Sequence, residues 1–177
     1  MQTYERAPAS SITWAVNFDW AQLYERHAGE LLGYLIKLVG DRDRASELLQ
    51  DTFVRGLRSD HTIREPAAVR GWLFQTATNL ARNDRRRRGL LRFIPFSGAE
   101  RAPEGAFDVG AEHVRAALRG ISTDEATVLL LRYHAGFSRA EIAAMQGTGE
   151  ETVKSRLSRG RKNFMAAYRR IERGLAR

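Results

Sequence analysis

A stretch near the C-terminus, residues 148–162, carries hydroxyl, guanidinium and ammonium groups at helical spacing. Apolar or small residues recur there at three- and four-residue steps, which predicts one side of a long helix: Val153, Leu157, Gly160, Phe164, Tyr168 and Ile171. The opposite side carries Ser155, Arg159 and Lys162, with Lys154, Arg156 and Arg161 on its flanks. A helix with an apolar back and a basic front fits the DNA major groove. From charge alone, a solvated basic helix is an equal alternative.

The residues upstream of this stretch favour DNA binding. Ser138 and Glu141 are spaced as a capping box, in which each side chain bonds the other residue's backbone N–H. The box would open a short helix that stops near Gly147. Two helices joined by a tight turn with glycine form a helix-turn-helix, whose second helix enters the major groove.

Composition narrows the classes of function. The chain has 177 residues, a formal charge of +8 and no cysteine, and its pI is near 10.5. This basicity favours a polyanionic partner. The lack of cysteine excludes disulfides and cysteine-based metal sites and suits the cytoplasm. We find neither a signal peptide nor a membrane-spanning run, and we expect no cofactor and no metal.

Helical periodicity predicts an all-α fold of two small helical domains joined by a flexible linker. We expect helices over residues 19–39 and 42–58, and a third from Pro66 into the arginine run before Gly89. Periodicity is then lost until about residue 110, and a further helix begins near Ala111. The expected divisions are an extension (1–17), an N-terminal domain (18–89), a linker (90–110) and a C-terminal domain (111–177).

Two helices of the N-terminal domain carry polar outer faces. The second helix shows Glu47, Gln50, Asp51 and Val54. An exposed valine among acidic groups in a basic chain indicates a protein contact, although a solvated face explains the pattern equally well. The third helix shows Asn79, Arg82, Arg85 and Arg86. Its arginines would attract phosphates, and Asn79 could read a base edge. For Asn83, nearer the apolar edge, a structural role is as plausible.

Four segments, in this order, resemble the extracytoplasmic-function (ECF) sigma factors of bacterial RNA polymerase. They are ASELLQDTFVR (45–55), GWLFQTATNLARND (71–84), LLLRY (129–133) and TVKSRLSRGR (152–161). The resemblance covers roughly residues 18–173. It implies a protein that binds core polymerase and directs promoter-specific initiation of transcription by reading the minus-thirty-five duplex and capturing the melted minus-ten element.

The resemblance also implies roles for individual residues and partners. The second helix would dock on the clamp coiled coil of the largest polymerase subunit through Glu47, Gln50, Asp51 and Val54. The minus-ten element would meet Asn79, Arg82, Asn83, Arg85 and Arg86. The minus-thirty-five element would meet Arg139, Thr152, Lys154, Ser155, Arg156, Arg159, Arg161 and Lys162. Further implied partners are promoter DNA, the flap of the second-largest subunit and an anti-sigma factor.

Two other functions compete with this interpretation. A stand-alone helix-turn-helix regulator would explain the C-terminal half but would leave the faces of the second and third helices without a role. An enzyme acting on nucleic acid would need paired carboxylates, a histidine cluster, a phosphate-binding loop or a Ser/His/Asp set. None of these occurs at a workable spacing, so we expect no enzymatic activity.

Overall fold

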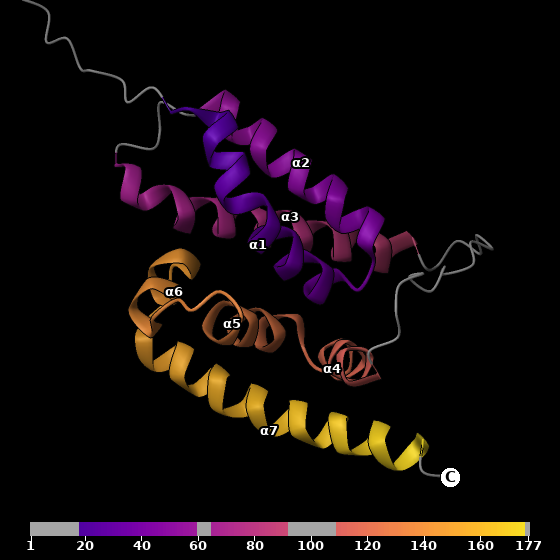
Figure 1. Ribbon diagram of the computed structural model, residues 1–177. Coiled ribbons are helices and arrows are strands. Elements are labelled where there is room, and N and C mark those ends of the chain that lie inside the picture. Colours follow the sequence, from indigo (N-terminus) through magenta and orange to yellow (C-terminus); the bar gives the residue numbers. More distant parts are fainter. Residues whose placement is uncertain (1–17, 60–64, 92–108, 176–177) are drawn as a thin grey trace, which may run out of the picture.

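A computed structural model describes residues 18–59, 65–91 and 109–175, all of whose regular structure is helical. In chain order the elements are α1 (Trp20–Val39), α2 (Arg42–Ser59), a 3-10 turn η2 (Pro66–Ala68), α3 (Val69–Leu91), α4 (Val109–Arg119), α5 (Thr123–Tyr133), α6 (Arg139–Gln146) and α7 (Glu150–Leu175). The helices form layers (Figure 1), with α4, α5 and α6 between the bundle of α1–α3 and the long α7. The all-α prediction is confirmed.

The first helix begins and ends where the sequence places its caps. Asp19 Oδ1 accepts a hydrogen bond from Gln22 N at 3.0 Å, which satisfies one of the unpaired N–H groups of the first turn. Gly40 ends α1 with a φ of 79°, a left-handed conformation that glycine adopts without a steric penalty. Between these caps, the face with Leu31, Tyr34 and Leu35 is fully buried against α2 and α3.

An aromatic cluster fixes the beginning of α1 against the other two helices of the bundle. The Trp20 ring makes edge contacts with the rings of Phe53 on α2 and Trp72 on α3, each with a centroid distance of 6.4 Å. Gly56 lies directly under Trp20, where an added Cβ would overlap the indole. Phe53 and Gly56 are both buried and so belong to the inner face of α2.

Local capping also organises the C-terminal helices. A capping box at Ser122 and Glu125 opens α5, with Glu125 N 3.3 Å from Ser122 Oγ. A central run of α5 is buried because the helix lies between α1 and α7. Gly160 of α7 meets α5 closely, since a Cβ at this position would lie 3.3 Å from Leu129 Cγ. A small residue at position 160 therefore sets the distance between α5 and α7.

The N-terminal and C-terminal halves are in direct contact, a feature that the prediction of two linked domains did not include. α1 packs against α4 and α5, and α3 packs against α6. The rings of Phe74 and Phe137 meet edge to face across the boundary at 5.1 Å. The guanidinium of Arg70 lies 4.2 Å from the Phe137 ring, forms an ion pair with Glu30 and donates to Ala135 O. The two halves therefore share one continuous hydrophobic core.

Some helix boundaries differ from the sequence prediction. Pro66 begins the 3-10 turn η2 instead of the α-helix itself, which starts at Val69. α3 continues past Gly89 to Leu91, and α4 begins at Val109 rather than near Ala111. Glycine lowers helix propensity but does not forbid a helix, so Gly89 alone was a weak stop signal. Most of the predicted linker, and the extension at residues 1–17, lie outside the described residues.

Candidate nucleic-acid interfaces

The predicted helix-turn-helix is present. Ser138 Oγ accepts from Glu141 N at 3.1 Å, and Ser138 N donates to Glu141 Oε2 at 2.7 Å. Hydrogen bonds from the side chain and the backbone N–H of Ser138 hold the pKa of the Glu141 carboxyl below its ordinary value. Gly147 ends α6 with a φ of 60°, and Thr148 N then donates to Ala143 O at 3.0 Å. The tight turn that separates α6 from α7 thus depends on the left-handed glycine.

The face of α7 opposite its apolar side is exposed. Val153, Leu157 and Gly160 are buried, whereas Phe164, Tyr168 and Ile171 are half-buried. The predicted minus-thirty-five side chains that are exposed on α6 and α7 are Arg139, Thr152, Lys154, Ser155, Arg159, Arg161 and Lys162. The structure therefore brings these polar side chains together on an accessible basic surface.

Two of the basic side chains predicted for α7 already have partners in the protein. Arg156 is half-buried, and its Nη1 donates to Gln146 Oε1 at 2.9 Å. Lys154 Nζ lies 3.1 Å from Glu151 Oε2 in the first turn of α7. Arg156 consequently braces the turn between α6 and α7, while Arg159, Arg161 and Lys162 have no ion pair within the described residues.

The polar face of α3 is only partly free. Asn79, Asn83, Arg85 and Arg86 are exposed as candidates for the minus-ten element. Arg82 is half-buried because it lies at the boundary of the two halves, where its Nη2 is 3.0 Å from Asp124 Oδ1. In this arrangement, the guanidinium of Arg82 binds a carboxylate of the C-terminal half.

The outer face of α2 is exposed as predicted, and it is more apolar than the sequence indicated. Glu47, Gln50, Asp51 and Val54 are all exposed. Leu57 and, from α1, Tyr24 are also exposed large hydrophobic residues. Leu57 follows Val54 by three positions, and this helical spacing was a signal that could have found it. Exposed apolar side chains among acidic ones are typical of a protein-binding surface.

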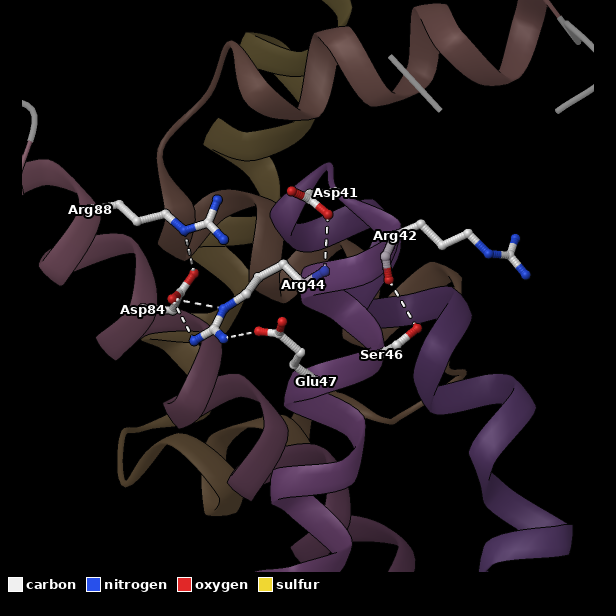
Figure 2. Close-up of polar contacts among 7 residues, drawn as sticks. All are labelled: Asp41, Arg42, Arg44, Ser46, Glu47, Asp84 and Arg88. Carbon is white, nitrogen blue, oxygen red and sulfur yellow. Dashed lines mark hydrogen bonds and ion pairs between the residues drawn. The ribbon is translucent and has the colours of Figure 1, made fainter. Parts of the chain in front are cut away.

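Ion pairs connect this face of α2 to the basic end of α3 (Figure 2). Arg44 binds Glu47 on its own helix and Asp84 on α3, and Asp84 also binds Arg88. Asp41 Oδ1 accepts from Arg44 N at 2.9 Å and so caps the start of α2. Sequence reasoning missed the pair of Arg44 with Asp84, because a contact between α2 and α3 forms only in the folded bundle. The pairs Arg44–Glu47 and Asp84–Arg88 lie within one helix each, and their helical spacing was a signal that could have found them.

The described residues contain neither a metal-ligand cluster nor a membrane-spanning helix. No group of three or more metal-ligating side chains is close enough to hold an ion in residues 18–59, 65–91 and 109–175. Within the same ranges, every helix is too short or too polar to cross a lipid bilayer.

Comparisons with known proteins agree with both halves of this geometry. Residues 23–90 match the family Sigma-70 region 2, and residues 111–164 match Sigma-70, region 4. Similar proteins include the ECF RNA polymerase sigma factor SigL of Mycobacterium tuberculosis, 32% identical over 142 residues that cover 76% of this chain and 80% of SigL. EcfG of Rhodopseudomonas palustris is 33% identical over 140 residues, which cover 77% of each protein.

The fold is also similar to solved structures. The sigma factor RpoE of Bartonella quintana, crystallised with the anti-sigma factor NepR, superposes with a TM-score of 0.70 and 26% identity over 85% of this chain and 97% of RpoE. CnrH, in complex with the cytosolic domain of CnrY, superposes with a TM-score of 0.64 and 25% identity over 83% of this chain and 85% of CnrH. The chain therefore belongs to the ECF RNA polymerase sigma factors.

Proposed function

We propose that this chain binds core RNA polymerase and directs it to promoters by reading the minus-thirty-five duplex and capturing the melted minus-ten element. The outer face of α2, with Glu47, Gln50, Asp51 and Val54, docks on the polymerase clamp. The polar face of α3 receives the minus-ten strand, and α7 enters the major groove at the minus-thirty-five element. The chain acts in the cytoplasm as an initiation factor without catalytic activity of its own.

The observation that carries this proposal is the simultaneous exposure of three faces of different chemistry. The face on α2 is acidic and apolar, which suits a protein partner. The faces on α3 and α7 are rich in arginine, which suits nucleic acid. All three helices bury their apolar sides in a shared core, so the outer faces keep fixed relative positions. A stand-alone regulator would use only the face on α7, whereas an initiation factor of the matched family would use all three, which supports the proposal.

Different contacts on these faces would supply affinity, sequence discrimination and placement in promoter recognition. Arginine and lysine contacts with phosphates supply affinity that depends on salt, whereas polar contacts with bases supply discrimination. Capturing a base from the minus-ten element costs a few kcal/mol of unstacking free energy. Contacts with exposed side chains such as Asn79 would offset that cost, and polymerase binding through α2 would hold α3 at the melted strand.

An anti-sigma factor is the remaining proposed partner. The solved structure of RpoE holds the anti-sigma factor NepR. We expect an inhibitor of this kind for the present chain, because it shares the family and the fold.

Transcription with purified components tests the proposed function. Core polymerase is incubated with a library of genomic fragments, with and without this chain, and the run-off transcripts are sequenced. We expect transcripts from a small set of promoters only when the chain is present. A stand-alone regulator would leave initiation by core polymerase unchanged, and that result would contradict the proposal.

A further inference from the structure

Four charged side chains form a continuous chain of ion pairs from α2 to α3. From one end to the other they are Glu47, Arg44, Asp84 and Arg88 (Figure 2). Arg44 Nη1 pairs with Glu47 Oε2, and Arg44 Nε and Nη2 lie 2.9 and 2.7 Å from Asp84 Oδ1. The other carboxylate oxygen of Asp84, Oδ2, lies 3.1 Å from Arg88 Nε. We call these residues the charge chain.

The ends of the charge chain are open to solvent, whereas its middle is sheltered. The side chains of Glu47 and Arg88 are 61% and 54% exposed, but those of Arg44 and Asp84 are only 26% and 11% exposed. Solvent and salt screen sheltered charges less than exposed ones. A change of charge at one end is therefore transmitted through the middle better than it would be between two fully exposed groups.

The two ends belong to different candidate surfaces. Glu47 lies on the face of α2 that is proposed to bind polymerase. Arg88 closes the run of four arginines on α3, and it is the member of that run that is held by a carboxylate. Arg85, Arg86 and Arg87 are exposed and form no ion pair with any described residue. Asp84 thus keeps Arg88 in an ion pair, next to three arginines that are free to bind phosphate.

We propose that Asp84 is a positioning residue through which engagement of Glu47 makes Arg88 available to a DNA phosphate. The charges of the chain alternate and sum to zero. A cationic group of the partner that takes up Glu47 leaves two guanidiniums around one carboxylate. Arg44, which has then lost Glu47 as its second carboxylate, binds Asp84 more strongly. The pair between Asp84 and Arg88 weakens as a result, and Arg88 is released at the other end.

The coupling works in both directions, because linkage between two sites is reciprocal. A phosphate that binds Arg88 leaves Asp84 more fully with Arg44, which weakens the hold of Arg44 on Glu47. Glu47 is then freer for its own partner. Binding of polymerase and binding of the minus-ten strand would therefore favour each other without a change of backbone structure. This inference rests on the proposed function for the identity of the two partners.

Neutralising Glu47 imitates its engagement and can be tested without polymerase. The full-length chain and its E47Q variant are titrated with fluorescein-labelled oligothymidylate over a series of salt concentrations. Asp43 is the matched control, since it is exposed on the same helix and forms no ion pair with the described residues. D43N makes the same change in net charge, so it measures the general electrostatic effect.

We expect E47Q to bind the oligonucleotide about two- to five-fold more tightly than D43N, the factor that corresponds to losing one exposed ion pair. One additional phosphate contact on a single strand should also steepen the plot of log affinity against log salt by about 0.7. The gain from E47Q should vanish when Arg88 is absent, so E47Q/R88Q should bind no more tightly than R88Q alone. Arg88 is 54% exposed, and R88Q removes its ion pair with Asp84 without removing buried apolar contacts. D84N should bind as E47Q does, and adding E47Q to D84N should give no further gain.

Equal affinities of E47Q and D43N would overturn the coupling, as would a gain that survives R88Q. Thermal unfolding of each variant identifies any loss of fold, and the comparison of E47Q, D43N and R88Q does not depend on D84N. Failure here would leave promoter-specific transcription intact. Conversely, a chain that does not direct transcription could still show the gain, so the two failures are distinguishable.

Discussion

Arg82 of α3 and Asp124 of α5 form an ion pair across the boundary between the two halves, with 3.0 Å between Nη2 and Oδ1. The pair places a residue predicted to meet the minus-ten strand in contact with the C-terminal half, which is proposed to read the duplex. Asp124 compensates the charge of Arg82 and occupies one of its N–H donors, so less of both is left for a phosphate. The contact between the halves therefore competes with DNA for this guanidinium.

Removing the charge of Asp124 should release Arg82. We expect D124N to bind single-stranded DNA a few-fold more tightly than the unmodified chain, since a partly exposed ion pair contributes about 0.2–1 kcal/mol. Fluorescence anisotropy with a labelled single strand measures the change. E172Q removes a carboxylate from the exposed C-terminal part of α7 and is the charge-matched control. Equal affinities of D124N and E172Q would contradict competition at Arg82.

Arg70 should contribute to the stability of the packed halves. R70A removes the contact with the Phe137 ring and the ion pair with Glu30. We expect the free energy of unfolding to fall by about 1–2 kcal/mol, because each such contact is worth up to about 1 kcal/mol when it is partly exposed. Urea denaturation gives this value. R85A, which truncates an exposed arginine without a partner among the described residues, should change it by less than about 0.5 kcal/mol.

A pair of glycine substitutions tests the packing of Trp20 on α2. In G56A the new Cβ would overlap the indole of Trp20, so the ring must move out of its aromatic cluster. We expect a loss of about 1–3 kcal/mol in the free energy of unfolding, the usual cost of overpacking a core. Gly29 lies inside α1 with open space where a Cβ would stand. G29A should instead stabilise the protein by up to about 1 kcal/mol, and equal effects of the two changes would refute this account of Gly56.

His134 should make stability depend on pH. Burial lowers the pKa of His134, and nearby Lys37 lowers it further, against the opposing effect of the Glu30 carbonyl. Its pKa in the folded state is therefore below the ordinary value of 6.5. Protonation favours the unfolded state, so the free energy of unfolding should fall as the pH drops below about 6.5. Between about pH 7 and pH 6, the urea midpoint of H134Q should fall less than that of the unmodified chain. An equal fall in both proteins would exclude His134 as a source of the pH dependence.

Arg159 should contribute to minus-thirty-five recognition. It is exposed on the front of α7 and has no ion pair within the described residues. R159A should weaken binding of the holoenzyme to its promoter by about 1–3 kcal/mol if the guanidinium makes a bidentate contact with a base. A gel-shift assay against a promoter with an altered minus-thirty-five element separates a base contact from a phosphate contact. A phosphate contact would lower affinity for both promoters equally.

Local signals in the sequence were sufficient for the helix-turn-helix. The capping pairs of Ser122 and Ser138 and the left-handed turn at Gly147 each involve residues within one helical turn of one another. Periodicity likewise placed Val153 and Leu157 inside and Arg159 outside. These features follow from backbone geometry, and they form in almost any tertiary setting.

Contacts between residues far apart in the sequence were not predictable in this way. Arg82 and Asp124 are 42 positions apart, and Arg44 and Asp84 are 40 apart. In the sequence, Asp84 is one acid beside a run of arginines, so it resembles an ordinary solvated residue. Its position against α2 depends on how three helices pack, and no local pattern encodes that packing.

The length of α7 has a mechanical consequence for promoter choice. Its 26 residues span about 39 Å at 1.5 Å per residue, and its far half rests on α4, where Tyr168 meets the ring of His113. The near half of the helix, with Val153 and Gly160, is held by α6 and α5, so α7 is supported along its length and not at one end alone. A change in α4 that displaces Tyr168 would therefore tilt α7 against α5 and would move Arg159 without touching any nucleotide.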